Sequence, residues 1–424
     1  MNRSISVIGL GYVGLPLAIL ADQKNYHVIG IDTDPKKIAL LNKKLSPFHD
    51  KKISKDLKTS GIIASQDYNN IQKSSIIIIC VPTPVNDDHT PNLSPVINAC
   101  KSLAPFLQKG QLIILESTVN PGVSEDIVLP ILEKISGLKC GPDFSLAHCP
   151  ERINPGDKKW TVENIPRVIG ATDETGLKRA AEFYRSIIKG EIKEMKTIKE
   201  AEAVKVVENS FRDINIAFVN ELAMSFDNLG IDVVNVINGA ATKPFAFMAH
   251  YPGCGVGGHC IPVDPYYLIE YARKHGFQND FLLMARNVNN KMPKYTADKV
   301  SDELNQKKIA INGTKVAVLG LSYKSNVGDD RESPSYKIIQ NLEKLGAEVA
   351  SFDSYIPDKS SASTLEDAIN GAKAVVIATC HKEFRKLTPE YLRSSGIEVV
   401  VDGRNCLSKE IFSSSGIIYK GIGQ

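Results

Sequence analysis

A glycine-rich stretch that ends in a cysteine is the most distinctive chemical feature of the sequence. The segment from Gly253 to Pro265 reads GCGVGGHCIPVDP, with Cys260 after the glycines and Asp264 four residues further on. Glycine has no Cβ, so this backbone can wrap closely around a ligand. The helical pattern that follows Cys260 would favour a thiolate through its free N–H groups, and Asp264 lies about one helical turn away. We predict that Cys260 is a nucleophile.

Three other interpretations of this segment stay open. A cysteine is often simply buried, because its thiol packs as a small apolar group. His259, Cys260 and Asp264 have metal-binding side chains, but the second pair of ligands that zinc sites usually show does not accompany them. A disulfide between Cys254 and Cys260 requires an oxidising compartment. We favour the nucleophile and predict no metal site.

A second chemical signature opens the chain. The sequence VIGLGYVG matches G-x-G-x-x-G with Gly9, Gly11 and Gly14, directly after an apolar run and before a helical pattern. Such glycines permit a tight turn, close approach of a pyrophosphate and packing of helix on strand. Asp32 ends the next apolar run, where a carboxylate accepts from ribose hydroxyls and repels a 2′-phosphate. We therefore predict NAD, while Lys37 keeps an NADP interpretation open.

Hydroxyl side chains follow two further predicted strands. Thr83 comes after the apolar run 76–81, and Thr118 comes after the run 112–116. Ligands of open α/β sheets lie beyond the carboxyl ends of the strands, so both threonines are candidates for cofactor or substrate contacts. The alternative is that they shape turns or cap helices.

A polar face marks a long helical segment in the middle of the chain. Lys205, Asn209 and Arg212 follow i, i+4, i+7 spacing and therefore share one face. Alanines and valines flank them, which indicates a largely buried helix, and polar groups on such a helix usually serve a site or a paired network. The alternative is a solvent-exposed charged stripe.

The last third of the chain has a charged loop directly after an apolar run. Lys324 and Arg331 lie in this loop, in the sequence SYKSNVGDDRESP. Both cations are suited to the phosphates of a second nucleotide, and the alternative is a charged loop without a ligand.

Alternating strands and helices must position these residues. Short apolar runs predict strands buried on both faces of a parallel sheet, at 5–9, 27–31, 76–81, 112–116, 145–148 and 167–169. Residues 197–229 contain no Gly or Pro and predict one long helix, and a second helical stretch is expected over about 265–291. Beyond Pro293, further runs predict a second, smaller sheet, at 314–320, 348–352, 374–378 and 397–401.

This pattern predicts an α/β fold of two Rossmann-like, doubly wound parallel-sheet domains joined by a long central helix. The expected divisions are residues 1–196, a central helical region 197–300, and residues 301–424. A length of 424 residues is consistent with two or three such units.

Composition limits the class of protein. Hydrophobic residues make up 43% and charged residues 23% of the chain, which excludes a disordered protein. The net charge of +3 argues against a nucleic-acid or membrane-surface binder. The first residues lack the features of a signal peptide, and no apolar run reaches membrane-spanning length. Eight cysteines are ordinary usage for reduced thiols, so we expect a cytoplasmic protein.

Taken together, the motifs resemble the nucleotide-sugar 6-dehydrogenases of the UDP-glucose/GDP-mannose dehydrogenase family. The resemblance covers essentially the whole chain, in the order GLGYVGLP, VPTP, ESTV, CPER, the Lys205/Asn209 helix, GVGGHCIPVDP and SYKSNVGDDRESP. It implies an NAD-binding domain at 1–196, a dimerising and catalytic central region at 197–300, and a UDP-sugar-binding domain at 301–424. Its members oxidise the sugar C6 alcohol to a carboxylate by two hydride transfers to NAD, without a metal.

The resemblance also assigns catalytic roles. It makes Cys260 the nucleophile that attacks the C6 aldehyde to form a thiohemiacetal, and the second hydride transfer leaves a thioester that water hydrolyses. It makes Lys205 the cation that stabilises negative charge at the C6 oxygen, with Asn209 beside it. A covalent anchor is consistent with oxidising an alcohol twice without releasing the aldehyde.

The remaining roles follow the same resemblance. Asp264 assists proton removal through a water near Thr118, and Glu151 activates the hydrolytic water. The NAD contacts are Gly9, Gly11, Tyr12, Val13, Gly14, Asp32, Lys37, Thr83, Thr118 and Arg331. The substrate contacts are Arg152, Ile153, Lys205, Asn209, Arg212, Gly257, Tyr323 and Lys324.

Local motifs point to the sugar. CPER and the segment that begins at Phe211 look like the N-acetylhexosamine branch of the family, whereas the UDP-glucose branch has Pro-Glu-Phe-Leu. The loop 242–245 looks like UDP-N-acetylglucosamine 6-dehydrogenases. UDP-N-acetylmannosamine enzymes tend to have His-Pro-Arg nearby, which this loop lacks, and Lys243 is expected to replace it in gripping the substrate. We predict UDP-N-acetylglucosamine oxidation for a surface polysaccharide, with UDP-N-acetylmannosamine and then UDP-glucose as alternatives.

Two functions of other classes stay open. A two-electron NAD alcohol dehydrogenase would share the N-terminal fold and the long helix, but it would not need Cys260. A non-catalytic nucleotide-sugar-binding protein would tolerate the loss of Lys205. The combined presence of Cys260, Lys205, Asn209, Asp264 and Glu151 argues against both.

Overall fold

Two compact units make up the fold. The computed structural model describes residues 3–48, 50–86, 90–152 and 159–424. Unit 1 comprises Met1–Glu208 and Tyr266–Gly276, and unit 2 comprises Asn209–Pro265 and Phe277–Gln424. The division falls inside helix α7 (Ile198–Leu229), which confirms the long helix predicted for 197–229. The three regions expected from the sequence stay a prediction.

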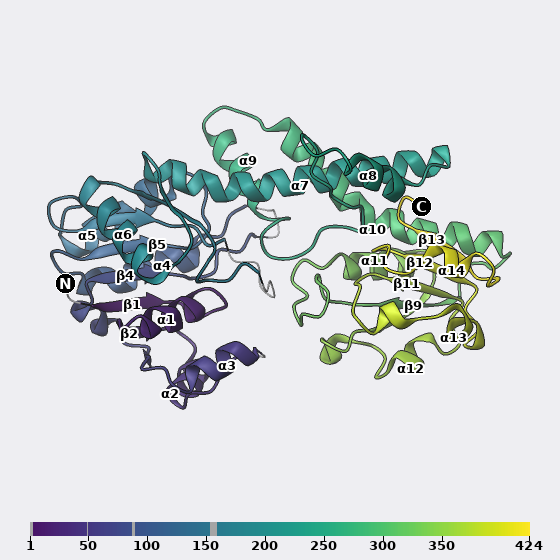
Figure 1. Cartoon of the computed structure of the whole chain (residues 1–424), viewed down its shortest axis with the longest axis horizontal. Coiled ribbons are helices and arrows are strands. Elements are labelled where there is room, and N and C mark those ends of the chain that lie inside the picture. The colour runs from purple at the N-terminus through teal and green to yellow at the C-terminus, as the bar shows by residue number, and fades with distance from the viewer. Residues whose placement is uncertain (1–2, 49, 87–89, 153–158) are drawn as a thin grey trace. The chain divides into compact units, whose positions relative to one another are not determined.

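Unit 1 is built on one twisted sheet, drawn in purple to blue in Figure 1. Its strand order is β3-β2-β1-β4-β5-β6-β7-β8, and the chain reverses direction of winding between β1 and β4. The described pairs are parallel except for β6 with β7, which is antiparallel. The strands are β1 (Ser4–Ile8), β2 (His27–Ile31), β3 (Ile63–Ser65), β4 (Ile76–Ile79), β5 (Leu112–Leu115), β6 (Ser145–His148), β7 (Arg167–Ala171) and β8 (Ile192–Glu194).

Helices cover both faces of this sheet. One apolar cluster joins the strands to α1 (Gly14–Gln23) and α6 (Glu174–Ile187), and the other joins them to α4 (Ser94–Leu103) and α5 (Leu129–Ser136). Burial on both faces explains the uninterrupted apolar strands, such as the four isoleucines of β4. The other helices are α2 (Pro35–Asn42), α3 (Lys51–Leu57) and α9 (Asp264–Lys274), with short turns η1 (Tyr68–Lys73), η2 (Ala104–Phe106) and η3 (Ser124–Val128).

Unit 2 contains a smaller, all-parallel sheet of order β10-β9-β11-β12-β13. Its strands are β9 (Lys315–Leu319), β10 (Glu348–Phe352), β11 (Ala374–Ile377), β12 (Val399–Asp402) and β13 (Ile418–Gly421). Helices α10 (Asp280–Gln306) and α11 (Pro334–Lys344) cover one face, while α12 (Leu365–Ile369), α13 (Pro389–Ser394) and α14 (Lys409–Phe412) cover the other. The turns are η4 (Pro357–Lys359) and η5 (Phe384–Lys386). The prediction of two doubly wound, Rossmann-like sheets is confirmed.

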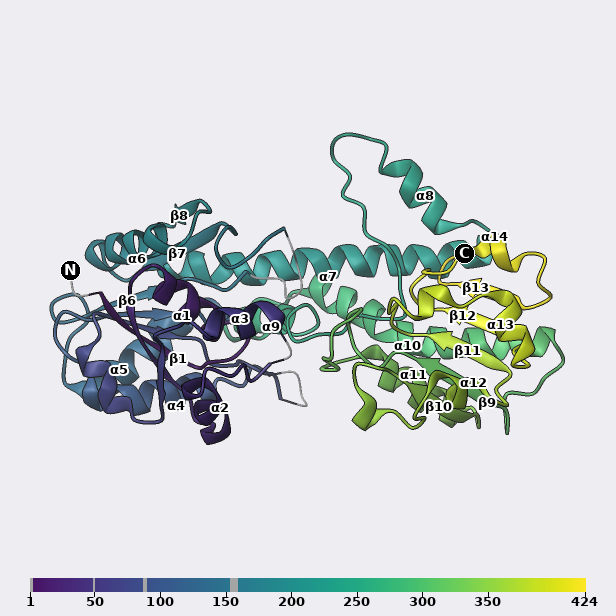
Figure 2. The ribbon, with the colours of Figure 1, turned by 60° about the horizontal axis from the view of Figure 1, so that its bottom comes forward.

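Helix α8 (Val233–Ala240) leads into an extended segment of unit 2. Its apolar side packs with the end of α7, with α10 and with Ile422 near the C-terminus. Figure 2 shows α8 and the segment after it projecting away from the sheet of the same unit. This segment exposes Phe245, Met248 and Tyr251, and it continues into the glycine-rich stretch before Cys260.

The structure corrects several expectations about elements. The helix expected over 265–291 is two helices, α9 and α10, because the chain turns at Gly276 with φ of 83°. Helix α10 also extends well past the expected end at residue 291, and it contains Pro293. Strands β3, β8 and β13 were not predicted, because each has only three or four residues. Helix α8 was not predicted either, although its sequence VVNVINGA is apolar, because it has only eight residues.

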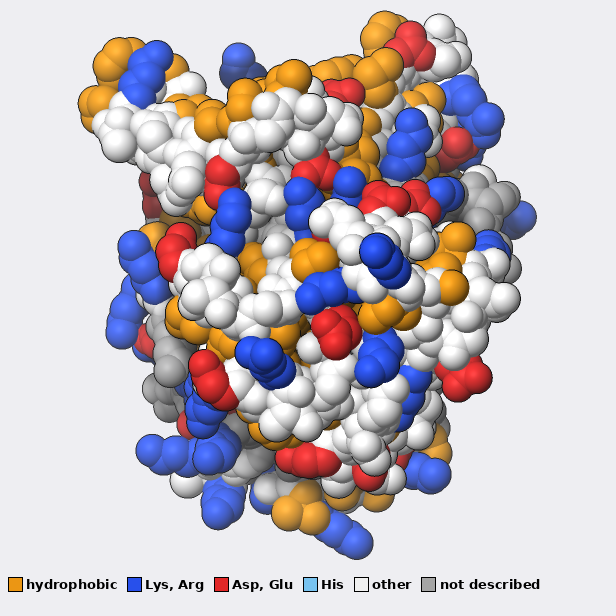
Figure 3. Space-filling view, turned by 90° about the vertical axis from the view of Figure 1, so that its right-hand side faces the viewer, with side chains coloured by type: hydrophobic (Ala, Val, Ile, Leu, Met, Phe, Trp, Pro, Cys, Tyr) orange, Lys and Arg blue, Asp and Glu red, His pale blue; other side chains and the backbone are white. Residues whose placement is uncertain are grey.

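Neither positive nor negative side chains dominate the face that Figure 3 draws. Figure 3 shows lysines, arginines and acidic side chains interspersed over the face turned to the viewer, with apolar side chains gathered towards the top of the view. Among the described residues, no helix is long and apolar enough to cross a membrane.

Candidate active site

The turn after β1 has the geometry that a dinucleotide requires. Gly9 has φ of 93°, and a Cβ on Gly14 would lie 1.9 Å from the carbonyl oxygen of Gly9. A Cβ on Gly11 would meet no atom within 4 Å, so the backbone is open there to an incoming group. The start of α1 has no side-chain cap, which leaves its N–H groups for phosphate oxygens. These features fit the pyrophosphate of NAD.

Asp32, the residue predicted to bind the ribose of NAD, directly follows β2. Its Oδ2 atom accepts the N–H of Leu10 at 2.8 Å, and its Oδ1 atom accepts the N–H of Asp34 at 3.0 Å. Lys37 Nζ lies 2.7 Å from Oδ2. Burial raises the pKa of Asp32, but the hydrogen bonds, led by that of Lys37, outweigh it and lower the pKa. The carboxylate is therefore ionised at neutral pH, as an acceptor of ribose hydroxyls must be.

The other predicted NAD contacts of unit 1 lie in the turn or follow β4 and β5, and they vary in exposure. Tyr12 is exposed and stacks on Phe48 with ring centroids 4.2 Å apart, and Val13 is half-buried. Thr83 is buried, and its carbonyl oxygen accepts the hydroxyl of Tyr267. Thr118 is half-buried after β5. Their contacts with NAD stay predictions.

In unit 2, three predicted catalytic residues come together. The carbonyl oxygen of Cys260 accepts the N–H groups of Val263 at 3.0 Å and Asp264 at 2.8 Å, which forms a tight turn. Asp264 is 2% exposed, and its Oδ2 atom accepts a hydrogen bond of 2.5 Å from Nδ2 of Asn209. Cys260 itself is exposed. An accessible thiol therefore lies next to a fixed carboxylate–amide pair.

The glycines before Cys260 are needed because another loop packs against them. A Cβ on Gly257 or Gly258 would lie 2.8 Å from side-chain atoms of Tyr323. The N–H of Gly258 donates to the carbonyl oxygen of Arg331 at 2.9 Å. The loop 322–331 thus holds the backbone that leads into Cys260, and larger side chains at the glycines would push it away.

Charges in this loop face the thiol. Arg331 interacts electrostatically with Cys260 and Tyr323, and it also pairs with Asp329 at 2.6 Å. A cation near a cysteine favours the thiolate. Burial raises the pKa of Tyr323, and burial followed by repulsion from Arg331 lowers the pKa of His259. His259 is therefore neutral at pH 7, and it adds no charge to the site.

Unit 1 holds the carboxylate predicted to activate water. Glu151 Oε2 lies 3.1 Å from Nη1 of Arg167, which also approaches Glu116 at 3.7 Å. Arg167 is fully buried, and the two carboxylates raise its pKa against the opposing effect of burial. Burial raises the pKa of Glu116 to about 7, and Tyr184 donates to the same carboxylate at 2.5 Å.

Sequence reasoning missed this buried network. In the sequence, Arg167 is the first residue of an apolar run that predicts a strand. A cation at the start of a strand that is buried on both faces is the signal that points to such a network. In such a position an arginine requires acidic partners. Its partner Glu116 had been noted only as the end of a strand.

The remaining predicted substrate residues lie in several places. In unit 1, Arg152 forms an ion pair with Glu208, and its Nη1 atom donates to the carbonyl of Pro166 at 2.9 Å. Lys205 is half-buried on the same helix as Glu208. Ile153 lies outside the described residues.

In unit 2, Arg212 is exposed and interacts electrostatically with Tyr323. Lys324 is half-buried. Lys243 is exposed, with Nζ 4.8 Å from the ring centre of Phe245. The substrate roles of all these residues stay predictions.

Arg404 is a second residue that the sequence analysis did not single out. Its Nε atom donates to the carbonyl oxygen of Ala378 at 2.8 Å, and its Nη1 atom donates to Gly255 at 3.3 Å. It therefore supports the glycine-rich stretch from the side of β12. In the sequence, Arg404 could have been recognised by its position just after a buried strand, at the sheet edge where ligands bind.

The structure bears on two other interpretations of the Cys260 segment, a disulfide with Cys254 and a metal site. Cys254 is buried and Cys260 is exposed, and both are free thiols. In the described ranges, no group of three or more His, Cys, Asp or Glu side chains is arranged to hold a metal ion.

Comparison with known proteins connects these features to one family. Models of the UDP-glucose/GDP-mannose dehydrogenase family match the NAD binding domain at residues 3–188, the central domain at 199–291 and the UDP binding domain at 317–409. The chain is 36% identical to a UDP-N-acetyl-D-mannosamine dehydrogenase of Pyrococcus horikoshii over 99% of both chains. It is 35% identical to a UDP-N-acetyl-D-glucosamine 6-dehydrogenase of Pseudomonas aeruginosa, over 93% of this chain and 94% of the relative.

A solved structure gives the same result for the fold. The UDP-D-ManNAc dehydrogenase structure from Pyrococcus horikoshii matches with a TM-score of 0.93 and 35% identity, over 99% of each chain.

Proposed function

Because the chain belongs to the UDP-glucose/GDP-mannose dehydrogenase family of NAD-dependent oxidoreductases, we propose that it oxidises C6 of UDP-N-acetylglucosamine from alcohol to carboxylate. The observation that carries this proposal is the exposed Cys260 beside the Asn209–Asp264 pair. A dehydrogenase that stops at the aldehyde has no use for a nucleophilic thiol, whereas a four-electron oxidation requires an anchor for the aldehyde.

The reaction balances with two equivalents of NAD and one water. When bound, NAD accepts the hydride that leaves C6 in each oxidation. After the first oxidation, the Cys260 sulfur forms a bond to the aldehyde carbon and gives a thiohemiacetal. Loss of the second hydride and of the hydroxyl proton gives a thioester, which water cleaves to the carboxylate and the free thiol.

Each proposed catalytic side chain has a defined task. Lys205 and Asn209 stabilise negative charge on the C6 oxygen during addition and elimination. Asp264 takes up the alcohol proton through a water near Thr118, and Glu151 activates the hydrolytic water. The ion pair of Glu151 Oε2 with Nη1 of the buried Arg167, at 3.1 Å, supports this role by holding the carboxylate in place.

The nucleotide parts of the ligands are divided between the units in this proposal. NAD is held by the glycine turn and Asp32 of unit 1, together with Tyr12, Val13, Lys37, Thr83 and Thr118. The UDP moiety is held by the family's UDP binding domain, to which Tyr323 and Lys324 belong. Arg331 is proposed as a further NAD contact.

Two sugars are candidates, and each has its own support. UDP-N-acetylglucosamine is favoured by the loop 242–245 and by a relative of that activity at 35% identity. UDP-N-acetylmannosamine is favoured by a relative at 36% identity and by the structure with a TM-score of 0.93. We take UDP-N-acetylglucosamine as the substrate, and UDP-glucose is the third to test.

The decisive experiment measures NADH formed per sugar consumed by the purified protein. UDP-GlcNAc, UDP-ManNAc, UDP-GalNAc and UDP-Glc are tested in parallel, with Cys260→Ser as the mechanistic variant and Cys406→Ser as its matched control. We expect two NADH per UDP-GlcNAc for the wild type and the control, and no uronate from Cys260→Ser. One NADH per sugar, or wild-type amounts of uronate from Cys260→Ser, would refute the thioester mechanism.

We also propose that the chain forms a homodimer through the central helix. Phe211 and Phe218 of α7 are about half exposed, and their seven-residue spacing places them on one face. Phe281 and Met284 near the start of α10 are also exposed. Exposed apolar side chains of this size are typical of a contact surface. Light scattering should show a dimer for the wild type and a monomer for Phe218→Asp.

The cellular setting is part of the same proposal. A cytoplasmic location is supported by the eight cysteines, all of them free thiols. A UDP-linked uronate made there would serve as a donor for a surface polysaccharide. Loss of uronate from the surface polysaccharide in a Cys260→Ser strain is the expected outcome, and an unchanged polysaccharide would contradict this role.

A further inference from the structure

Unit 2 contains a buried aspartate in the position that Asp32 holds in unit 1. Each aspartate directly follows the strand next to the first strand of its unit, β2 or β10. In unit 1, the N–H of Leu10 donates to Asp32 Oδ2 at 2.8 Å. In unit 2, the N–H of Leu321 donates to Asp353 Oδ2 at 2.7 Å. The two units therefore place a carboxylate in the same way.

The second carboxylate is saturated by its own chain. Asp353 Oδ2 also accepts the N–H of Ser322 at 2.8 Å, the hydroxyl of Ser322 at 2.7 Å and Nε2 of His381 at 3.0 Å. All three residues are fully buried. Burial raises the pKa of Asp353, but hydrogen bonds from His381 and Ser322 outweigh it and hold the pKa well below its usual value. Four donors meet at Oδ2, and the N–H of Tyr355 donates to Oδ1 at 2.8 Å, so Oδ2 has no acceptor position left for a ribose hydroxyl.

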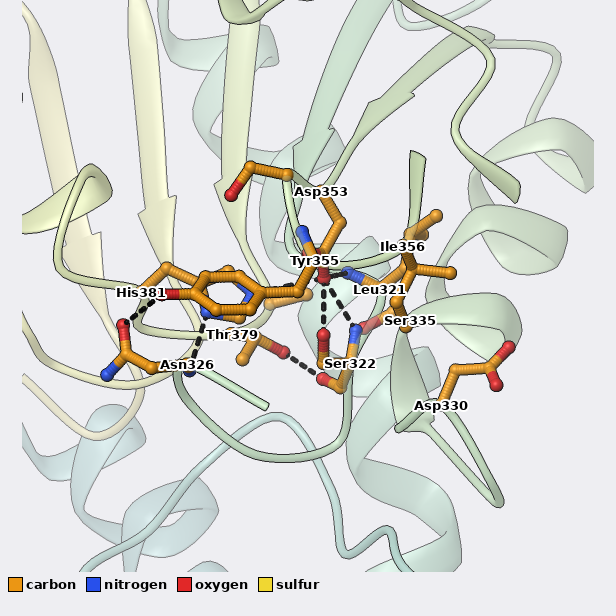
Figure 4. Close-up of polar contacts among 12 residues, drawn as sticks. Leu321, Ser322, Asn326, Asp330, Ser335, Asp353, Tyr355, Ile356, Thr379 and His381 are labelled. Atoms are coloured by element: carbon orange, nitrogen blue, oxygen red, sulfur yellow. Dashed lines mark hydrogen bonds and ion pairs between the residues drawn. The ribbon is translucent and has the colours of Figure 1, made fainter. Parts of the chain in front are cut away.

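His381 links this aspartate to a surface loop. Figure 4 shows the imidazole between Asp353 and Asn326, with the ring of Tyr355 stacked on it at a centroid distance of 4.7 Å. The N–H of Asn326 donates to His381 Nδ1 at 2.8 Å. Because a backbone N–H can only donate, Nδ1 is the unprotonated nitrogen, and the ring proton lies on Nε2, facing Asp353.

Asn326 occupies the middle of the loop 322–331. Its φ is 61°, a left-handed conformation that asparagine adopts more readily than most other non-glycine residues. Its side-chain oxygen accepts the N–H of Lys382 at 3.0 Å. The contacts with His381 and Lys382 therefore hold Asn326 against the segment that follows β11.

The same loop carries the residues that we propose bind UDP. Lys324 and Tyr323 precede Asn326 by two and three residues. Tyr323 packs against Gly258, whose N–H also donates to the carbonyl oxygen of Arg331. A shift of Asn326 would therefore move both the UDP-binding side chains and the backbone that leads to Cys260.

We propose that His381, held by Asp353 in the Nε2–H form, is a positioning residue that fixes the loop 322–331 for UDP binding through Asn326. It touches neither substrate nor cofactor, and it acts through the loop. The inference rests on the proposed function only in assigning Tyr323 and Lys324 to the UDP moiety.

Substitution of His381 by asparagine or by glutamine tests the contacts of its two ring nitrogens separately. In His381→Asn, the side-chain oxygen can take the place of Nδ1 and accept from Asn326, while the contact with Asp353 is lost. In His381→Gln, the side-chain amide can take the place of Nε2 and donate to Asp353, while Asn326 loses its acceptor. Asn326→Gly permits the positive φ and keeps the N–H that donates to His381, while it removes the acceptor for Lys382, so it tests the His381 contact apart from the Lys382 contact.

The test uses the full chain and UDP alone as the probe. Calorimetry should show UDP affinity about fivefold weaker for His381→Gln, the effect of one neutral hydrogen bond. His381→Asn and Asn326→Gly should stay within about twofold of the wild type. NAD affinity should be the same for all, and amide exchange of Asn326 should be fast only in His381→Gln. Equal losses of UDP affinity in His381→Asn and His381→Gln would indicate a merely structural histidine and overturn the proposal.

A second measurement does not depend on how the variants fold. Nitrogen-15 spectra of the histidines in the wild type should show His381 with a bare Nδ1 and a protonated Nε2. A proton on Nδ1 would overturn the proposed positioning role of His381. A wild type that binds no UDP would overturn it too. A protein that binds UDP but oxidises none of the four sugars would refute the proposed function and leave this inference standing.

Discussion

Asn209 donates from Nδ2 to Oδ2 of Asp264 at 2.5 Å, although 55 positions separate the two residues in the chain. The bond fixes a nearly inaccessible carboxylate next to the turn that carries Cys260. Hydrogen bonds to a charged group are strong, so the geometry of this pair is sensitive to the removal of either partner.

Substitution at this pair should reduce turnover without unfolding the protein. For Asp264→Asn we expect kcat to fall about 100-fold, the scale of losing a positioned proton acceptor. For Asn209→Ala we expect a fall of about tenfold, since the carboxylate remains but is no longer oriented. Asn228→Ala, at an exposed position near the end of α7, is the matched control and should be unaffected. Steady-state kinetics with unchanged circular dichroism checks this, and wild-type turnover in Asp264→Asn would contradict it.

Two glycines of the first turn should respond differently to alanine. Gly11→Ala should fold normally and lose NAD affinity, because its Cβ meets only the space for the pyrophosphate. Gly14→Ala should destabilise unit 1, because its Cβ would lie 1.9 Å from the Gly9 oxygen. Calorimetric titration with NAD and thermal unfolding separate the effects, while UDP binding serves as the internal control. Normal NAD affinity in Gly11→Ala would show that the pyrophosphate lies elsewhere.

A buried ion pair in unit 2 should matter far more than an exposed one on the same helix. Asp213 and Arg286 are 2.5 Å apart and almost completely buried, and Asn289 donates to the same carboxylate. Removal of one partner leaves a buried charge, so Asp213→Ala should lower the free energy of unfolding by about 3–5 kcal/mol. In contrast, Asp298→Ala breaks an exposed pair with Lys294 and should cost less than about 1 kcal/mol. Urea unfolding of both variants provides the comparison, and equal losses would disprove the distinction.

Asp227 should make unit 2 sensitive to acid. Burial raises its pKa, but hydrogen bonds from Lys299, Lys420 and Tyr295 outweigh it and lower the pKa to about 2. A carboxyl whose pKa is lowered on folding stabilises the fold above its ordinary pKa of 3.8, and this contribution is lost as the pH falls through about 2. With allowance for solvent screening, the contribution at neutral pH is about 1 kcal/mol.

The matching experiment follows the unfolding temperature between pH 5 and pH 2. Asp227→Asn should be less stable than the wild type at pH 5, and the difference should shrink towards pH 2. Asp302→Asn is the control, because Asp302 lies 3.6 Å from the same Lys299 but is largely exposed. A constant difference across this range would mean that Asp227 does not act through its charge.

Much of the fold and part of the site follow from local patterns in the sequence. The glycines of the first turn and Asp32 are recognisable because a tight turn and a strand end are set by neighbouring residues. The separation of Cys260 from Asp264 is likewise a local spacing, and the structure closes it with a turn. The prediction of a single helix over 265–291 is wrong, because the chain turns at Gly276 within a segment whose pattern is otherwise helical.

The sequence by itself determined the chemistry available: the glycine turn, a cysteine after a glycine-rich stretch, the acidic strand ends and the alternation that builds two sheets. The tertiary structure alone decided which distant groups are partners, such as Asn209 with Asp264, Arg167 with Glu151, and His381 with Asp353. The physical reason is that turns and helices depend on contacts within a few residues. Partners far apart in the chain are instead selected by strand order and by the cost of burying a charge alone.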